Sequence, residues 1–395
     1  MSYILNDPTI FNTPQLNLFD MYRLSVGNNV FGGDSLPIRW MKYNNLLDGN
    51  YLADAIESGD LQCVQYLHNE DYRWNDEVCI VAAKYGRLDI LKYLLEKGYE
   101  WSKWHCCLSA AGNGQHKILK YLRDEGYIWD SGAYTSAAEN GQLKILKYLQ
   151  EQVPLQDMRC ACAAANGHLD CLKYLHELGC SWDKRTCNKA AENGEIDCLI
   201  YAHEEGCKWY TSTIRRTVEN GHLDCLIYLH ENGCRWTVST TRAAAEYGHL
   251  NCLIYLHENG CPWDERACTK AAENGNLDCL KYLHEQGCLW DENICNLAAR
   301  NGHLRCLIYL HEEGCKWNES TCMNAATNGH LNCLIYLHEN GCPWDEDTSG
   351  IAADFDHLNC LQYAIEHGCP WYGNAYRDCR IYKYLVEKGL SSLIL

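Results

Sequence analysis

The amino-acid sequence predicts an all-α solenoid, because one unit of about 27 residues recurs along most of the chain of 395 residues. Gly248, Gly275, Gly302 and Gly329 are in step, and a cysteine follows each of them by four residues. A tyrosine recurs seven residues after this glycine position in all twelve copies. Stacked repeats share one continuous core, so we expect a single array, although length alone suggests two or three domains.

The second half of each unit has the pattern of a helix. Leucines two, five and eight residues after the glycine lie on one helical face, as Leu277, Leu280 and Leu283 do. A further glycine twelve residues after the first, such as Gly287, suits the left-handed residue that ends a helix. We therefore expect a helix of about ten residues in each unit.

The first half of each unit predicts another helix, which follows a tryptophan. This tryptophan is present in eleven of twelve copies, Leu155 being the exception. The next residue has a side chain suited to an N-cap in nine of eleven internal junctions, and departs at Gln156 and Tyr210. The nine are Asn75, Ser102, Asp130, Asp183, Thr237, Asp264, Asp291, Asn318 and Asp345. Each unit is therefore a helix-turn-helix hairpin, with an Asn-Gly style turn between its helices.

The two ends of the chain depart from the repeat. Residues 1–46 hold three of the seven prolines and no cysteine, and we expect an N-terminal capping or docking segment there. The array occupies residues 47–371. After Trp371 the signature Tyr384-Leu385 to Gly389 returns too soon for two helices, so residues 372–395 are predicted to form a C-terminal capping helix.

The bulk composition excludes several classes of function. The chain has 34 Lys and Arg residues and 52 Asp and Glu residues, which gives a formal net charge of −18. Because this charge repels phosphate backbones, we expect no nucleic-acid partner. No stretch of about 18 apolar residues and no signal peptide is present, so no membrane contact is expected. The 27 cysteines are odd in number and recur inside helical patterns. We interpret them as reduced thiols of a monomeric protein in the cytoplasm.

The repeated cysteines and histidines leave one alternative open, a thiol-rich metal-binding or redox protein. Against it, Cys171 and Cys180 would lie on opposite sides of a helix, too far apart for a shared ion or a disulfide. Ile90 stands where other repeats have the first of these cysteines, which indicates a compact apolar filler. Only cross-turn disulfides, such as Cys180 with Cys187, remain open. We expect no cofactor and no metal.

No enzyme signature is found. A catalytic site needs one uniquely surrounded nucleophile and base, whereas the Cys and His pair recurs in nearly identical settings. The repeated histidines, such as His230, fall near the end of the second helix, where we expect them to meet free carbonyl groups. The tryptophans are expected to fill the space between repeats.

The series Ala-Ala-x-x-Gly-His-Leu-x-x-Leu-x-Tyr-Leu-x-x-x-Gly from Ala325 to Gly341 resembles the ankyrin repeat. The run Gly-Cys-Pro-Trp-Asp-Glu at Gly260 to Glu265 is similar to the short variety found in large DNA viruses and protists. Each unit is six residues shorter than the usual one, and the missing residues correspond to the β-hairpin finger. A leucine-rich repeat also fits the period, but its strand signature is absent. The resemblance implies a solenoid of about twelve short ankyrin-like repeats that acts as a non-catalytic protein–protein interaction scaffold or adaptor.

By this resemblance, the first helices line the concave, partner-facing surface of the array. Their outward positions vary from repeat to repeat, and consecutive repeats place a basic row there. The partner is predicted to be an unidentified protein with an acidic surface. The alternative is ordinary pairing along each helix, as of Arg215 with Glu219 or Arg242 with Glu246. The candidate partner-binding residues are Trp104, Arg185, Lys189, Arg215, Arg216, Arg242, Arg266, Lys270 and Met323.

Overall fold

The computed structural model describes residues 51–69, 77–99, 101–152, 161–182, 184–291, 293–371 and 380–389. These residues form helices and no strands, and none of their helices is long and apolar enough to cross a membrane. The chain divides into two compact units, Met1–Ser181 and Trp182–Leu395. The predicted segment 1–46 lies outside the described residues, as does most of 372–395.

Within the described part of the first unit, five hairpins follow one another. They pair α3 (Tyr51–Ser58) with α4 (Leu61–Asn69), α5 (Val78–Lys84) with α6 (Leu88–Glu96), α7 (Lys103–Gly112) with α8 (His116–Asp124), α9 (Ser131–Glu139) with α10 (Leu143–Gln152), and α11 (Ala161–Ala165) with α12 (Leu169–Glu177).

The described part of the second unit continues with seven hairpins and one single helix. They pair α13 (Lys184–Asn193) with α14 (Ile196–Glu204), α15 (Thr213–Glu219) with α16 (Leu223–Glu231), α17 (Val238–Tyr247) with α18 (Leu250–Glu258), α19 (Glu265–Glu273) with α20 (Leu277–Glu285), α21 (Ile294–Arg300) with α22 (Leu304–Glu312), α23 (Glu319–Thr327) with α24 (Leu331–Glu339), and α25 (Glu346–Asp354) with α26 (Leu358–Glu366); α27 (Arg380–Glu387) follows. The predicted helical solenoid of twelve helix-turn-helix repeats is confirmed.

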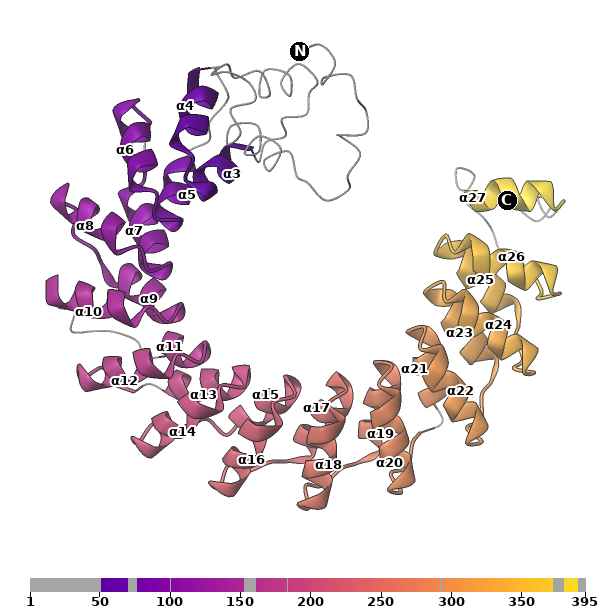
Figure 1. Cartoon of the computed structure of the whole chain (residues 1–395). Coiled ribbons are helices and arrows are strands. Elements are labelled where there is room, and N and C mark those ends of the chain that lie inside the picture. Colours follow the sequence, from indigo (N-terminus) through magenta and orange to yellow (C-terminus); the bar gives the residue numbers. More distant parts are fainter. Residues whose placement is uncertain are drawn as a thin grey trace, which may run out of the picture. The chain divides into compact units, whose positions relative to one another are not determined.

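Two rows of helices run through each unit (Figure 1). In the second unit, the first helices of successive hairpins pack closely on one another, whereas the second helices touch each other less. This asymmetry places the first helices on the tighter side of the row and the second helices on the wider side. Each repeat therefore presents its first helix to one surface and the end of its second helix to the other.

The predicted helix ends are found where glycine and cap residues stand. Gly275 and Gly287 have φ angles of +77° and +83°, the left-handed conformation that glycine adopts without strain. Ser102, Asp130 and Thr237 each accept a backbone N–H of the following helix with the side chain, as predicted.

The cysteines form part of the core. Of the 25 cysteines in the described residues, 24 are buried and Cys162 is half-buried. Cys252 and Ile90 occupy the same repeat position and are both almost fully buried, which confirms the compact filler predicted there. Burial raises the pKa of the Cys252 thiol to about 11 and that of Cys225 to about 12. Both thiols are therefore protonated at neutral pH.

Neighbouring repeats of the second unit meet at a histidine, a tryptophan and a tyrosine. The His230 ring stacks on Trp236, with ring centroids 3.7 Å apart and 25° between the planes. A hydrogen bond of 2.9 Å joins His230 Nδ1 and the hydroxyl of Tyr255 in the next repeat. These two contacts are found in six sets of three residues: His203–Trp209–Tyr228, His230–Trp236–Tyr255, His257–Trp263–Tyr282, His284–Trp290–Tyr309, His311–Trp317–Tyr336 and His338–Trp344–Tyr363.

We call this set of contacts the His-Trp-Tyr joint. The expectation that these histidines meet free carbonyl groups of their own helix is wrong, because the neighbouring tyrosine supplies a better-placed partner. The tryptophans do fill the space between repeats, but most are half-buried; Trp129 and Trp371, at 3% and 7% exposed, are the buried exceptions in the described residues.

A second contact between repeats lies at the turns between the two helices. In several hairpins the residue after the turn glycine reaches back to the end of the preceding first helix. His249 Nε2 lies 2.9 Å from the Glu219 carbonyl oxygen, and Asn276 Nδ2 donates to the Ala245 carbonyl at 2.9 Å. A histidine at this position also covers the turn glycine of the preceding repeat. A Cβ added to Gly275 would lie 2.4 Å from His303 Nδ1.

The turn of the last described hairpin differs from the other turns. Asp356 takes the place of the turn glycine there, with φ +58°, and the structure describes no further hairpin beyond it. Its carboxylate pairs with Arg380 of α27 at 3.0 Å, and Lys388 pairs with Glu366 of α26 at 3.1 Å. Leu385 of α27 is fully buried. The predicted capping role of this helix remains a proposal.

We predict that Gly275→Ala destabilises the chain more than Gly287→Ala. Both positions are left-handed, so alanine costs about 1–2 kcal/mol at either. At Gly275 the added Cβ also meets the His303 ring, whereas nothing lies within 4 Å of the Cβ built at Gly287. Free energies of unfolding from urea denaturation measure the difference, and equal losses in the two variants would show that the turn contact is not required.

We also predict that the stability of the chain falls as the pH drops below about 6.5, where an unfolded histidine begins to protonate. The pKa values of His203, His330 and His338 are lowered, in each case chiefly because burial disfavours the charged ring. His303 and His357 in the adjacent repeats lower the pKa of His330 further. The folded state thus binds fewer protons than the unfolded state, so stability is complete above about pH 6.5 and is lost as the pH falls through the folded pKa values.

His330→Asn tests this assignment, because asparagine at the equivalent position, Asn276, makes the same contact without titrating. The variant should fold, and its free energy of unfolding should change less between pH 7 and pH 5 than that of the natural chain. An unchanged or steeper pH dependence would contradict the assignment.

Candidate partner-binding face

The first helices divide into a buried and an outward face, as α19 illustrates. Ala267, Cys268 and Ala271 are at most 1% exposed and face the core. Glu265 and Arg266 lie on the opposite side and are exposed. The outward face of the first helices is the candidate partner-binding face.

The structure places the predicted site residues on this face to different degrees. In the second unit, Arg266 of α19 is exposed, as are four residues of α13 and α15, whereas Arg242, Lys270 and Met323 are half-buried. The four residues are Arg185, Lys189, Arg215 and Arg216.

In the first unit, Trp104 of α7 is 43% exposed. Its indole N–H donates to Asp130 Oδ2 of the next repeat at 3.0 Å, and its ring packs edge-on against His105. Trp104 therefore presents a fixed aromatic surface on the outward side of its helix.

Carboxylates lie among the cations of the basic row. Lys189 pairs with Glu192 at 2.9 Å, and Arg215 pairs with Glu219 at 2.9 Å, the pairing that the alternative interpretation foresees. The two cations are about half exposed, so each pair contributes little to stability, about 0.2–1 kcal/mol.

Other pairs link neighbouring first helices. Arg216 of α15 reaches Glu192 of α13 at 3.5 Å, and Lys270 of α19 reaches Glu246 of α17 at 3.7 Å. Lys270 also pairs with Glu273 at 2.8 Å within its own helix. The row is thus a mixed network, in which five of the seven predicted cations pair with carboxylates of the first helices or of the segment before them.

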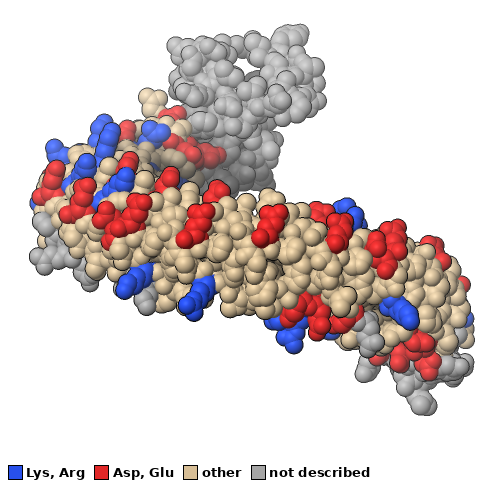
Figure 2. Space-filling view, turned by 90° about the horizontal axis from the view of Figure 1, so that it is seen from below, with Lys and Arg blue, Asp and Glu red and all other residues tan. Residues whose placement is uncertain are grey.

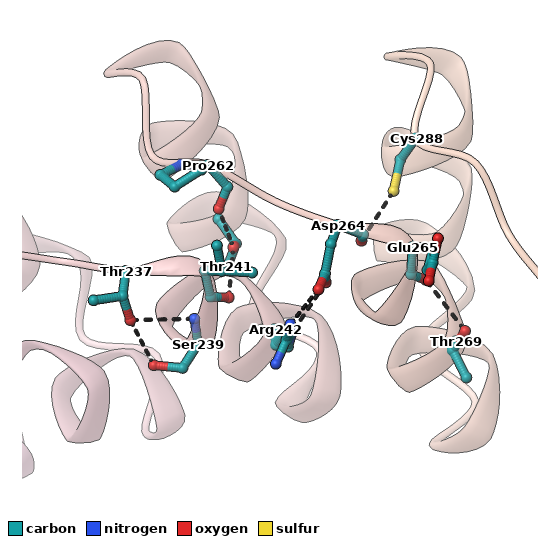
Figure 3. A network of polar contacts seen from close by, with 10 residues as sticks. Thr237, Ser239, Thr241, Arg242, Pro262, Asp264, Glu265, Thr269 and Cys288 are labelled. Carbon is teal, nitrogen blue, oxygen red and sulfur yellow. Dashed lines mark hydrogen bonds and ion pairs between the residues drawn. The ribbon is translucent and has the colours of Figure 1, made fainter.

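Arg242 has a different role from the other cations. It does not pair with Glu246, as the alternative predicted, but with Asp264 of the next repeat. Two of its three guanidinium nitrogens, Nε and Nη2, contact the two carboxylate oxygens (Figure 3). Arg242 Nε donates to Asp264 Oδ1 at 2.9 Å. This hydrogen bond holds the pKa of Asp264 below its usual range and raises the pKa of Arg242. Arg242 is therefore committed to the junction between α17 and α19.

The neighbouring Thr241 fixes the same junction from the buried side. Its hydroxyl donates to the Pro262 carbonyl at 2.7 Å, and Cys288 Sγ donates to the Asp264 carbonyl at 3.4 Å (Figure 3). Asp264 thus stands at the predicted N-cap position, where its carboxylate binds Arg242 and its backbone carbonyl accepts a hydrogen bond from Cys288.

Two further outward positions are occupied by contacts between repeats. Asn188 Oδ1 accepts the backbone N–H of Tyr210 at 3.1 Å and also the Thr213 hydroxyl. Asn296 Oδ1 accepts the Thr321 hydroxyl at 2.6 Å. Both asparagines stand in first helices, Asn188 in α13 and Asn296 in α21. Their amide oxygens tie one first helix to the next.

Exposed aromatic residues are also found where two of the first helices end, and sequence reasoning missed them. Tyr247 and Phe355 end their first helices and are 52% and 57% exposed. Other repeats have asparagine there, as at Asn274 and Asn301, whose side-chain amides donate to the carbonyl four residues earlier. An aromatic residue in place of this asparagine is a signal that aligning the repeats would have found.

The opposite surface has another charge pattern. Figure 2 shows a face on which Asp and Glu side chains recur at intervals across a largely uncharged surface. Each second helix in the described hairpins of the second unit has an exposed glutamate in its last turn, which adds to the negative charge of the chain. These residues are Glu204, Glu231, Glu258, Glu285, Glu312, Glu339 and Glu366. The face of the first helices is therefore the less acidic of the two.

A metal site, the alternative left open above, would need several ligand side chains close together among the described residues. In that part of the chain, no three His, Cys, Asp or Glu side chains come together in an arrangement that could hold a metal ion. Met158, an outward residue of the predicted face, lies outside the described residues.

Solved structures of other helical-repeat proteins resemble the chain weakly. The pentatricopeptide repeat protein PPR10 in complex with an 18-nt psaJ RNA element matches with a TM-score of 0.38 and 12% identity, over 89% of this chain and 63% of that chain. A form of PPR10 with three cysteines changed to serine, in complex with the same element, gives 0.36 and 13%, over 89% and 63%. PPR10 from maize gives 0.32 and 12%, over 91% and 65%. The chain spans less than two thirds of the length of these structures, and likeness of this size says nothing of what the chain binds.

No curated protein matches the chain. A family model described as ankyrin repeats (3 copies) matches residues 52–131, 241–321 and 295–391, which together make up more than half of the sequence. With the twelve helix hairpins described above, this match identifies the family: the chain belongs to the ankyrin repeats.

Proposed function

We propose that the protein is a non-catalytic interaction scaffold that binds a partner protein along the outward face of its first helices. One observation carries the proposal. The residues that pack the repeats are nearly the same in every hairpin, whereas the outward residues of the first helices change from repeat to repeat. A repeated frame with varied outward side chains suits recognition of one extended surface.

The same repetition argues against catalysis. The His-Trp-Tyr joint and the buried cysteines recur in matching surroundings, and none of them has the unique setting that a nucleophile or a general base needs. The Cys225 and Cys252 thiols inside the second helices are protonated at neutral pH and make poor nucleophiles.

The charges of the candidate face favour a partner with an acidic surface. The chain as a whole is acidic, with a net charge of −18, whereas the seven cations of the basic row gather on the first helices of four consecutive hairpins, α13, α15, α17 and α19. Such local contrast orients an approaching acidic protein toward the first helices. A nucleic acid, with about one negative charge per 1.7 Å of duplex, is repelled by the large negative charge of the whole chain.

We further propose that the chain is a monomeric adaptor of a reducing, cytoplasmic compartment. The 27-residue unit and its Gly-Cys-Pro-Trp-Asp-Glu runs support the short variety of large DNA viruses and protists. Residues 1–46 and 372–395 are proposed to cap the array, and the first of them is also proposed to recruit a second protein.

A charge-reversal variant tests the binding face. We predict that changing Arg185, Lys189, Arg215 and Arg266 to Glu lowers recovery of the partner at least about tenfold, because each lost or reversed contact costs about 1 kcal/mol or more. Arg242 is left unchanged, because it holds Asp264. Recovery is measured after affinity purification from the cell that makes the protein, beside direct binding of a polyglutamate peptide.

The matched control reverses Lys208, Arg235, Arg305 and Lys316, which are exposed but lie off the first helices. It changes the net charge by the same amount and should leave recovery unchanged. Equal losses in the two variants would mean that only the overall charge matters. Unchanged recovery with the first-helix variant would remove this face as the binding site.

A further inference from the structure

Two cysteines within one hairpin bring their sulfur atoms into direct contact. Cys295 Sγ, in the first helix α21, donates to Cys315 Sγ at 2.9 Å. Cys315 directly follows the glycine that ends the second helix α22. A disulfide bond has a sulfur–sulfur distance of about 2.0 Å, so a small movement separates this contact from a covalent bond.

Three other hairpins repeat this pairing in the same register. In each, the thiol of the first helix interacts with the thiol that follows the second helix, and this interaction raises the pKa of the first-helix thiol. Cys268 Sγ, for example, donates to the backbone carbonyl of Cys288 at 3.7 Å. The pairs are Cys187–Cys207, Cys268–Cys288 and Cys322–Cys342. Three of the four pairs fall in consecutive hairpins, from α19 to α24. We call the four the thiol pairs.

The remaining hairpins of the second unit supply a natural comparison. They keep the cysteine after the second helix but have another residue in the first helix. Ile214 stands opposite Cys234, Thr241 opposite Cys261, and Ser349 opposite Cys369. The core tolerates these other residues, so packing alone does not require sulfur at both places.

The two thiols of a pair differ in environment. Cys295 is fully buried, whereas Cys315 lies at the rim of the core and is 9% exposed. The hydrogen bond from Cys295 holds the pKa of Cys315 below its ordinary value and raises the pKa of Cys295. Cys288 and Cys268 show the same two directions for the same cause. The rim thiol is thus the one suited to react first, and the buried thiol stands in contact with it.

We propose that the thiol pairs are sites of reversible oxidation, each closing to a disulfide within its own hairpin when the chain meets a peroxide. The rim thiolate attacks one peroxide oxygen and becomes a sulfenic acid, and the other oxygen leaves as hydroxide. The buried thiol then displaces hydroxide from the sulfenic sulfur and loses its proton, so that water forms. In sum, two thiols and one hydrogen peroxide give one disulfide and two waters, with two electrons passing from sulfur to oxygen.

Such a bond would tie the first helix to the segment that leads into the next repeat. Each bridge spans 20 residues of sequence, the whole of one hairpin. Closing three consecutive hairpins would stiffen that part of the second unit and its outward face. This property goes beyond the proposed scaffold function and does not depend on the identity of the partner.

Peptide mapping of the full chain tests the proposal. The reduced protein is treated with hydrogen peroxide in the presence of glutathione, free thiols are blocked, and the chain is digested without reductant. Mass spectrometry should find cross-linked peptides for the four thiol pairs, each lacking two hydrogen atoms. Cys234 and Cys261 should be recovered as blocked thiols. The midpoint of thermal unfolding should rise after treatment and return after dithiothreitol.

Two substitutions sharpen the test. Cys295→Ser should remove its own cross-link and leave the other three. Ile214→Cys should add a fifth, with Cys234, and this gain does not depend on the folding of the first variant. The proposal is overturned if the pairs stay reduced at a dose that oxidises the glutathione, or if Cys234 and Cys261 of the natural chain form disulfides as often as the paired cysteines do.

Discussion

Between neighbouring repeats of the second unit, a histidine ring lies on the tryptophan of its own repeat and shares a hydrogen bond with a tyrosine of the next. The stacking of two rings contributes about 0.5–1.5 kcal/mol beyond the area that it buries, and a partly buried hydrogen bond contributes about as much. In an array whose parts touch only their neighbours, stability is the sum of such junction terms. Each repeat thus depends on this joint, which connects it to the repeat that follows.

The joint also explains how a unit of only about 27 residues can stack. The usual ankyrin unit resembled by this chain is longer by the residues of a β-hairpin finger. Here the indole and imidazole rings occupy the junction, while the turn histidines and asparagines secure the other edge, as His249 and Asn276 do. These positions are fixed by packing. The outward residues of the first helices are less constrained, and they are where recognition is proposed.

Much of the fold could be predicted from the sequence, because its signals are local. The glycines, the N-caps and the leucine stripe each report on one helix, and the hairpins found in the described residues follow them. What sequence reasoning missed lies between repeats. The usual spacing of four residues along a helix favoured Glu246 as the partner of Arg242, but Arg242 pairs with Asp264 of the next repeat. The contact between Cys295 and Cys315 was missed for a similar reason, since spacing along one helix does not show which residues meet across a hairpin. Which face binds a partner depends on the partner, and no pattern within the chain reveals it.

A double-mutant cycle tests the central claim most directly. His257→Ala and Tyr282→Phe remove the two sides of a hydrogen bond of 2.8 Å between neighbouring repeats. Their effects on the free energy of unfolding should be non-additive by about 0.5–1.5 kcal/mol. His257→Ala combined with Tyr309→Phe, whose hydroxyl contacts His284 instead, should be additive within about 0.5 kcal/mol. A coupling between His257 and Tyr282 no larger than that of the control pair would contradict the claim that this joint holds the repeats together.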